Sequence, residues 1–295
     1  MELVRYSKNV HQLFVQGSQV KIAVLSDLHW DNPKCNRELL KEHLDYCLKE
    51  NIPVIVNGDF FCLMQGKGDK RGNKSDIRPE HNNAKYLDSI VETAVEWFSP
   101  YASILTVLGY GNHETAIIKY QETDILQRFV DLLNYKNNSN VMTGGYGGWI
   151  SIRQGFNKSK AVFYKLKYFH GSGGGGVVTK GALNLTRALE MYEGFDIFTM
   201  GHIHENSARH DVRDTLIHSP HNGYVLEQKE LHLMITGTYK EEYGDGSKGW
   251  HVERGAPIKP VGGRILVLSI ERKQWEGEDR LIKHIDSIRF NKWVK

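Results

Sequence analysis

The sequence contains little cysteine and no long apolar run. Its three cysteines, Cys35, Cys47 and Cys62, are odd in number and match no zinc-knuckle spacing. We therefore predict no disulfide framework and a reducing compartment. The longest apolar runs, such as residues 104–108, are far shorter than the ~20 residues of a membrane-spanning helix. The first residues do not resemble a signal peptide either, so we expect a cytoplasmic protein without a membrane partner.

An excess of charge of one sign is also absent. Lys and Arg number 38 and Asp and Glu 35, and the formal charge of +3 is too small to indicate a nucleic-acid partner by itself. Of the 295 residues, 40% are hydrophobic and 11% aromatic, which excludes a mainly disordered chain. No linker divides the sequence, so we expect a single domain over residues 1–295.

Short apolar runs and helical periodicity alternate through the first two-thirds of the chain. This pattern predicts an α/β protein whose main sheet is buried on both faces. We expect helices at 37–49, 84–98, 123–133 and 180–192. We expect strands at 21–26, 53–56, 103–108, 149–153, 161–168, 196–200, 224–228, 232–236, 264–270 and 281–290. The last third, about 205–295, is rich in strands, and we expect it to complete a second sheet.

Residue types that bind metal ions follow five of the predicted strands. The five segments are Asp27-Leu28-His29, Asn57-Gly58-Asp59, Gly111-Asn112-His113-Glu114, His170-Gly171 and Gly201-His202-Ile203-His204. Because open α/β sheets bind ligands at the carboxyl ends of their strands, we expect these side chains to meet. Mixed His, Asp and Asn ligands suit manganese, iron or zinc better than calcium or magnesium.

The spacing within the segments has a geometric reason. Alternate side chains of extended backbone share one face, so Asp27 and His29 can reach the same ion, as can His202 and His204. Glycines precede several of these residues and leave room for a pair of ions. Two divalent ions ~3.5–4 Å apart can hold the oxygens of a phosphate during an in-line displacement.

The five segments, in this order, resemble the pattern of the calcineurin-like metallophosphoesterase superfamily: D-x-H, G-D, G-N-H-[DE], H and G-H-x-H. The resemblance covers residues 27–204. It implies two packed mixed β-sheets flanked by helices, and an enzyme that hydrolyses phosphate esters with two divalent ions. Manganese is the expected ion, with iron or zinc as alternatives.

The resemblance also implies a role for each matching residue. The ligands of the first ion would be Asp27, His29, Asp59 and His204. Asp59 would bridge to the second ion, whose further ligands would be Asn112, His170 and His202. A hydroxide bridging the ions would be the nucleophile. His113 would not be a ligand but the general acid that protonates the leaving oxygen.

The second segment departs from a common variant of the pattern. Many members have G-D-x-x-D, whereas this chain has Gly58-Asp59-Phe60-Phe61-Cys62. We expect Cys62 to be a small buried residue rather than a ligand. The fifth segment is closer to the phosphodiesterase and repair-nuclease branches than to the protein Ser/Thr phosphatases.

The substrate is the least determined part of the prediction. We favour a phosphodiester, with DNA or RNA as candidates, over a phosphomonoester of a nucleotide or small metabolite. A non-catalytic scaffold is a further alternative, which the complete ligand set disfavours. The expected substrate contacts are Asn112, His113, Tyr239 and Lys240. The loop 65–83 carries several basic residues that either steer a polyanion or are simply solvated. Gly171–Gly176 is either a phosphate cradle or a loop over the site.

Overall fold

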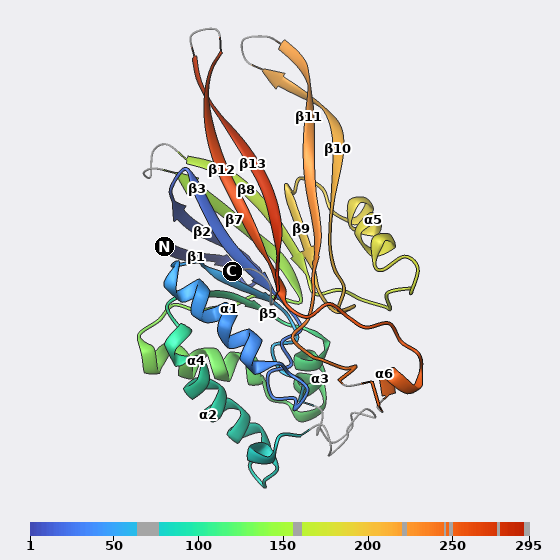
Figure 1. Ribbon diagram of the computed structural model, residues 1–295. Helices are drawn as coiled ribbons and strands as arrows, with labels where there is room; N and C mark the ends of the chain where they lie inside the picture. The colour runs from blue at the N-terminus through green and yellow to red at the C-terminus, as the bar shows by residue number, and fades with distance from the viewer. Residues whose placement is uncertain are drawn as a thin grey trace.

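The computed structural model (Figure 1) describes residues 1–63, 77–155, 161–219, 223–244, 246–247, 250–275 and 278–291. Most of these residues belong to two β-sheets and the helices that cover them. Among the described residues, no helix combines the length and the apolar character needed to cross a membrane.

One sheet has six strands within the described residues. In spatial order they are β13 (Glu278–Phe290), β12 (Gly263–Trp275), β3 (Gln19–Leu25), β4 (Val54–Asn57), β5 (Leu105–Gly109) and β6 (Met142–Thr143). The strands from β3 to β6 are parallel, and β12 joins β3 antiparallel. β4 and β5 are fully buried, as parallel strands covered on both faces must be.

The other sheet has seven strands within the described residues. In spatial order they are β1 (Glu2–Ser7), β2 (Val10–Gln16), β7 (Gly147–Gly155), β8 (Ala161–Phe169), β9 (Ile197–Met200), β11 (Gly223–Thr236) and β10 (Asn206–Ser219). β9 lies parallel to both β8 and β11. The short β9 therefore ends beside the carboxyl ends of two longer strands.

The two sheets pack face to face over a shared apolar core. This core contains residues from both sheets, such as Val24 and Leu266 from one and Ile150 and Leu166 from the other. The outer face of the six-stranded sheet is covered by α1 (Arg37–Lys49), α2 (Tyr86–Phe98) and α4 (Ile125–Asn137). α5 (Ala182–Met191) covers the seven-stranded sheet. The predicted fold class, two mixed sheets flanked by helices, is confirmed (Figure 1).

Four further helical segments lie within the described residues. They are α3 (Asn112–Gln121), α6 (Trp250–Glu253) and the 3-10 turns Pro79–His81 and Ser99–Tyr101. Side-chain caps fix where α1 and α4 begin. Asn36 Oδ1 accepts the Leu39 N–H at 2.9 Å before α1, and Asp124 Oδ1 accepts the Gln127 N–H at 2.9 Å before α4. Both are residue types that favour this position.

The last third of the chain differs from the prediction in one respect. Instead of completing one sheet, it divides between both: β10 and β11 extend the seven-stranded sheet, and β12 and β13 the six-stranded sheet. Each pair forms a long antiparallel hairpin, and both hairpins project from the same end of the molecule (Figure 1). Sequence periodicity predicts where a strand lies in the sequence but not which strand it pairs with. In addition, β10 is too polar to be recognised as an apolar run.

Candidate metal centre

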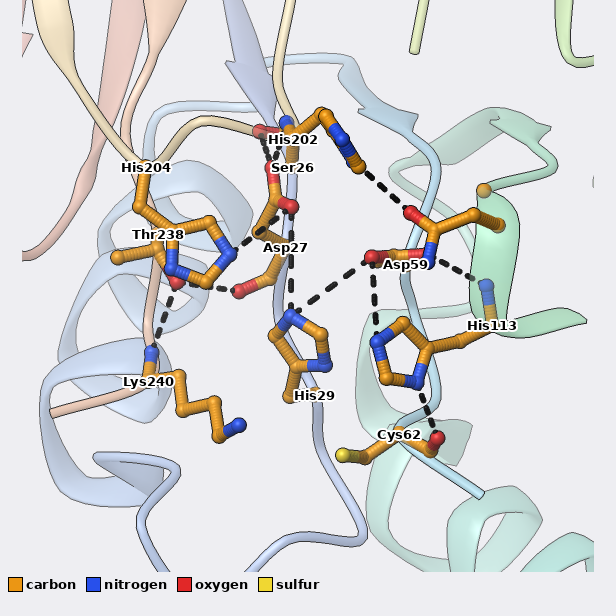
Figure 2. Close-up of polar contacts among 12 residues, drawn as sticks. Ser26, Asp27, His29, Asp59, Cys62, His113, His202, His204, Thr238 and Lys240 are labelled. Carbon is orange, nitrogen blue, oxygen red and sulfur yellow. Dashed lines mark hydrogen bonds and ion pairs between the residues drawn. The ribbon is translucent and has the colours of Figure 1, made fainter. Parts of the chain in front are cut away.

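Five strand ends from the two sheets meet at one place, where the metal-binding residue types are found. β3, β4 and β5 are parallel neighbours in one sheet, as are β8 and β9 in the other. Their carboxyl ends therefore face the same region. Figure 2 shows Asp27, Asp59, His202 and His204 in this region, with His29 between the two aspartates.

The first donor group consists of Asp27, His29 and His204, whose ligand atoms lie within 4.8 Å of one another. Asp27 Oδ1 is 3.2 Å from His204 Nε2 and 4.0 Å from His29 Nε2. The other oxygen, Oδ2, accepts hydrogen bonds from Ser26 Oγ at 2.6 Å and from the His202 N–H at 2.9 Å. The carboxylate is thus anchored by one oxygen and presents the other to the two imidazoles.

The second donor group consists of Asp59, His170 and His202, again within 4.8 Å. Asn112 joins them, because its Oδ1 lies 2.8 Å from His202 Nδ1 and 3.3 Å from His170 Nε2. The Nδ1–H of His170 donates to the Asn57 carbonyl at 2.9 Å. A hydrogen bond of this kind fixes the ring and leaves Nε2 free to bind a metal ion.

Asp59 lies between the two groups. Its Oδ2 is 3.4 Å from His170 Nε2 in the second group and 3.8 Å from His29 Nε2 in the first. Burial disfavours a charged His170, yet the Asp59 carboxylate raises the pKa of His170 to about 10. The Asp59 carboxylate thus favours a positive charge at His170 Nε2, which either a proton or a metal ion can supply.

Buried atoms without hydrogen-bond partners show that the site fits metal ions. They include Asp27 Oδ1 and both ring nitrogens of His29, which is only 2% exposed. Buried polar atoms are normally paired, so such orphan atoms need a ligand. Burial, with the His113 ring nearby, holds the pKa of His29 well below its usual value, which keeps it neutral, as a ligand must be. Imidazole, carboxylate and amide donors suit manganese, iron or zinc.

The backbone around the site is strained. Five of the predicted ligands have positive φ angles: Asp27 (50°), His29 (46°), Asp59 (49°), His202 (68°) and His204 (57°). Non-glycine residues rarely adopt this conformation, and it clusters at functional sites. The expectation that Asp27 and His29 lie on an extended segment was therefore wrong. The left-handed turn after β3, rather than strand geometry, directs Asp27 and His29 into the first group. The expectation that His202 and His204 reach the same ion was also wrong, because the turn after β9 directs His202 into the second group and His204 into the first.

The glycines leave room for the candidate ligand side chains. A Cβ atom at Gly58 would overlap with His170, and one at Gly111 or Gly201 would overlap with Asp59 or Asp27. The close approach of the strand ends therefore requires glycine at these positions.

His113 lies beside the two groups without belonging to either. Its Nδ1–H donates to the Cys62 carbonyl at 2.5 Å, and its Nε2 is 3.8 Å from Asp59 Oδ2. The backbone N–H of His113 donates to Asp59 Oδ1 at 3.1 Å. The imidazole is 9% exposed, so its Nε2 lies at the edge of the candidate metal centre.

Asn112 and His113 begin α3, a helix that was not predicted. The missed signal is Glu114, three residues after Gly111, which is typical of a capping box. Glu114 Oε2 accepts the Gly111 N–H at 2.8 Å and the Asp59 N–H at 3.2 Å, and Oε1 accepts the Phe61 N–H at 2.8 Å. One buried carboxylate therefore joins the start of α3 to the segment that carries Asp59.

A second buried carboxylate, Asp31, fixes the continuation of that segment. It is 3% exposed and accepts the N–H groups of Cys62 at 2.5 Å and Leu63 at 2.8 Å. Because the Cys62 carbonyl orients the His113 ring, Asp31 positions His113 through the backbone. Nothing in the local sequence distinguishes Asp31 from a surface acid, so this role was not predicted.

One predicted substrate contact is wrong. Tyr239 is fully buried in the core, where its hydroxyl lies 2.7 Å from His43 Nδ1. Its contribution to the site is a backbone N–H donated to the Asp27 carbonyl at 3.0 Å. Lys240, the next residue, lies near His204 (Figure 2) and forms an ion pair with Glu242.

Lys240 and Glu242 also line a small pocket. Its volume is about 190 Å³, and its other walls include His251, Ile258 and Lys259. Lys259 forms an ion pair with Glu205, the residue after His204, which places the pocket beside the first donor group. Four basic residues of the loop 65–83, namely Lys67, Lys70, Arg71 and Lys74, lie outside the described residues.

Comparisons with known proteins identify the family but no near relative. A model of the calcineurin-like phosphoesterase family matches residues 20–232. A comparison with curated proteins gives no match. A Thermotoga maritima protein solved by NMR is 12% identical, covering 90% of this chain and 98% of its own, with a TM-score of 0.32. GAP50, described as the anchor in the inner membrane complex of Plasmodium, is 12% identical, covering 94% and 91%, with a TM-score of 0.43.

The family match spans more than half of the chain and includes all five segments that carry the donor groups. The chain belongs to the calcineurin-like phosphoesterase family and is a metal-dependent phosphoesterase.

Proposed function

We propose that the chain hydrolyses phosphate esters with two metal ions, one in each donor group, bridged by Asp59. The observation that carries this proposal is the position of Asp59 Oδ2, within 3.8 Å of His29 Nε2 and 3.4 Å of His170 Nε2. When bound, the ions supply positive charge to the phosphate oxygens and lower the pKa of a water molecule. Manganese is our proposed ion, because the donors are nitrogen and oxygen atoms.

The protein residues would position the substrate and move one proton. Asn112, at the start of α3, would orient a phosphate oxygen as well as hold the second ion. His113 would donate its Nε2 proton to the leaving oxygen. Its Nδ1–H is held by the Cys62 carbonyl at 2.5 Å, so the proton to be transferred is on Nε2, the nitrogen that borders the centre.

We favour a phosphodiester as the substrate, with DNA or RNA as candidates. The support is the resemblance of Gly201-His202-Ile203-His204 to phosphodiesterases and repair nucleases, together with Lys240 beside the first donor group. The competing candidate is a phosphomonoester of a nucleotide or metabolite. It is favoured by the pocket of about 190 Å³ next to Lys240, which accommodates one small group rather than a strand.

The experiment that separates these candidates uses two chromogenic substrates. The metal-stripped chain is supplied with manganese and assayed on a bis-aryl phosphodiester and on the matching monoester. Faster hydrolysis of the diester supports the phosphodiesterase, whereas faster hydrolysis of the monoester supports the alternative. A chain that binds manganese but hydrolyses neither would point to the scaffold. We also propose a cytoplasmic location, which the three buried free cysteines support.

A further inference from the structure

We propose a third metal site, selective for thiophilic ions, formed by Cys62, His29 and His113. Their ligand atoms lie within 4.8 Å of one another, as close as those of the two donor groups already described. We call these three residues the thiol group. The proposal rests on the proposed function in one respect: the ion bound here would capture His113, the general acid, and so inhibit hydrolysis.

The second nitrogen of His29 is the main reason to expect a ligand here. His29 Nε2 faces Asp27 and Asp59, at 4.0 and 3.8 Å. Its Nδ1 is also buried and without a hydrogen-bond partner. Figure 2 shows this nitrogen on the side of the ring that faces Cys62. The first donor group accounts for one orphan nitrogen, and the thiol group accounts for the other.

The surroundings of Cys62 suit a bound ion. The side chain is 1% exposed, and its Sγ accepts a hydrogen bond from Asn32 Nδ2 at 3.2 Å. Burial raises the pKa of the Cys62 thiol, so the sulfur is protonated until an ion displaces its hydrogen. The Asn32 amide then stabilises the thiolate. Binding would release the thiol proton, the Nδ1 proton of His29 and the proton of the His113 nitrogen that becomes a ligand.

The donor chemistry separates this site from the dinuclear centre. One thiolate and two imidazoles prefer Zn²⁺, Cd²⁺ or Cu⁺, whereas the nitrogen and oxygen donors around Asp27 and Asp59 also accept Mn²⁺. The selectivity depends on Cys62, which occupies the position where many family members have an acidic residue. The thiol group thus gives this chain a sensitivity to thiophilic ions that an acidic residue would not confer.

A Co²⁺ titration of the full chain tests the site directly. Cobalt bound to a thiolate absorbs in the near ultraviolet by charge transfer, whereas cobalt bound only to nitrogen and oxygen does not. We expect this band in the metal-stripped chain after the two donor groups are filled. It should be absent in Cys62→Ser. Cys47→Ser is the matched control, because Cys47 is also fully buried but belongs to no donor group, and it should keep the band.

An inhibition assay tests the consequence. In the manganese-loaded enzyme, the Cd²⁺ concentration that halves activity should rise by about tenfold or more in Cys62→Ser, relative to that variant's own activity, because a ligand is lost. Cys62→Ala repeats the test if the serine variant misfolds. Absence of the band in the unmodified chain, or its persistence in Cys62→Ser, would overturn the proposal. A cobalt–thiolate band in a chain that hydrolyses no phosphate ester would instead overturn the proposed function but not the third metal site.

Discussion

The Nδ1 atom of His113 lies 2.5 Å from the carbonyl oxygen of Cys62. Since a carbonyl only accepts, this contact fixes the hydrogen on Nδ1 and directs Nε2 toward the metal centre. The proposed acid role of His113 therefore depends on the backbone after Asp59, and that backbone is fixed by two buried carboxylates, Glu114 and Asp31.

Replacement of the acid should depend on the leaving group. We expect His113→Ala to retain its metal ions but to lose about 10²–10⁴-fold in rate on esters with poor leaving groups, which need protonation. Esters of acidic phenols should be affected much less. Rates measured over a series of aryl esters test this, and equal slowing across the series would contradict the acid role.

Loss of the bridge should remove both metal binding and activity. Asp59→Asn replaces an anionic oxygen near both donor groups with a neutral amide. We expect no measurable turnover and fewer than two bound ions per chain, because shared charge no longer holds them together. Elemental analysis after dialysis gives the stoichiometry. Two retained ions with normal turnover would show that Asp59 does not bridge.

Asp31 should act on His113 from a distance. Asp31→Asn leaves the N–H of Cys62 or Leu63 without its charged acceptor, so we expect a loss of about 1–3 kcal/mol in the free energy of unfolding. We also expect the His113-dependent rates to fall most for poor leaving groups. Glu92→Gln, at an exposed position of α2, is the control. A stability loss without any change in leaving-group dependence would mean that Asp31 is structural only.

Protonation of buried histidines should destabilise the chain in acid. Burial lowers the pKa of His43 to about 4 from 6.5, so between these values the unfolded chain binds the extra proton. The contribution is complete above pH 6.5 and is lost as the pH falls towards 4. Denaturant unfolding between pH 7 and 5 measures the slope. We expect His43→Gln to reduce it, and an unchanged slope would contradict the assignment.

Removal of metal should lower thermal stability, because ions that bind only the folded chain stabilise it. At a concentration about 100 times the dissociation constant the gain is about 2.7 kcal/mol. We expect the melting temperature to fall with a chelator and to recover with manganese. His204→Ala, which removes one ligand from the first donor group, should respond less. An identical response in both proteins would argue against binding at that group.

The metal-binding segments could be predicted because they sit where buried strands end. The runs before Asp27, Asp59 and His202 are short and mainly apolar. β4 and β9 are fully buried and β3 is buried over its last four residues, so hydrophobicity locates these strands and the ligand types follow directly. The predicted bounds of α1 also match the structure, because its apolar spacing and its Asn36 cap indicate the same first residue.

Other features depend on contacts that no local pattern reveals. β1 and β10 are largely exposed, so they lack an apolar signature, and their pairing is set by tertiary context. Tyr239 lies in an aromatic and basic stretch that resembles a binding loop, yet its ring completes the core beside His43. The contacts of Asp31 and of Cys62 join segments about 30 residues apart. The spacing of residues within one segment does not predict contacts between segments so far apart in the sequence.

The most direct test of the central claim is a manganese titration of the metal-stripped chain with hydrolysis and bound metal followed together. We predict that hydrolysis of an aryl phosphodiester rises with occupancy and saturates at two ions per chain, one for each donor group around Asp59. Full activity with one bound ion, or two bound ions without hydrolysis of any aryl phosphate, would contradict it.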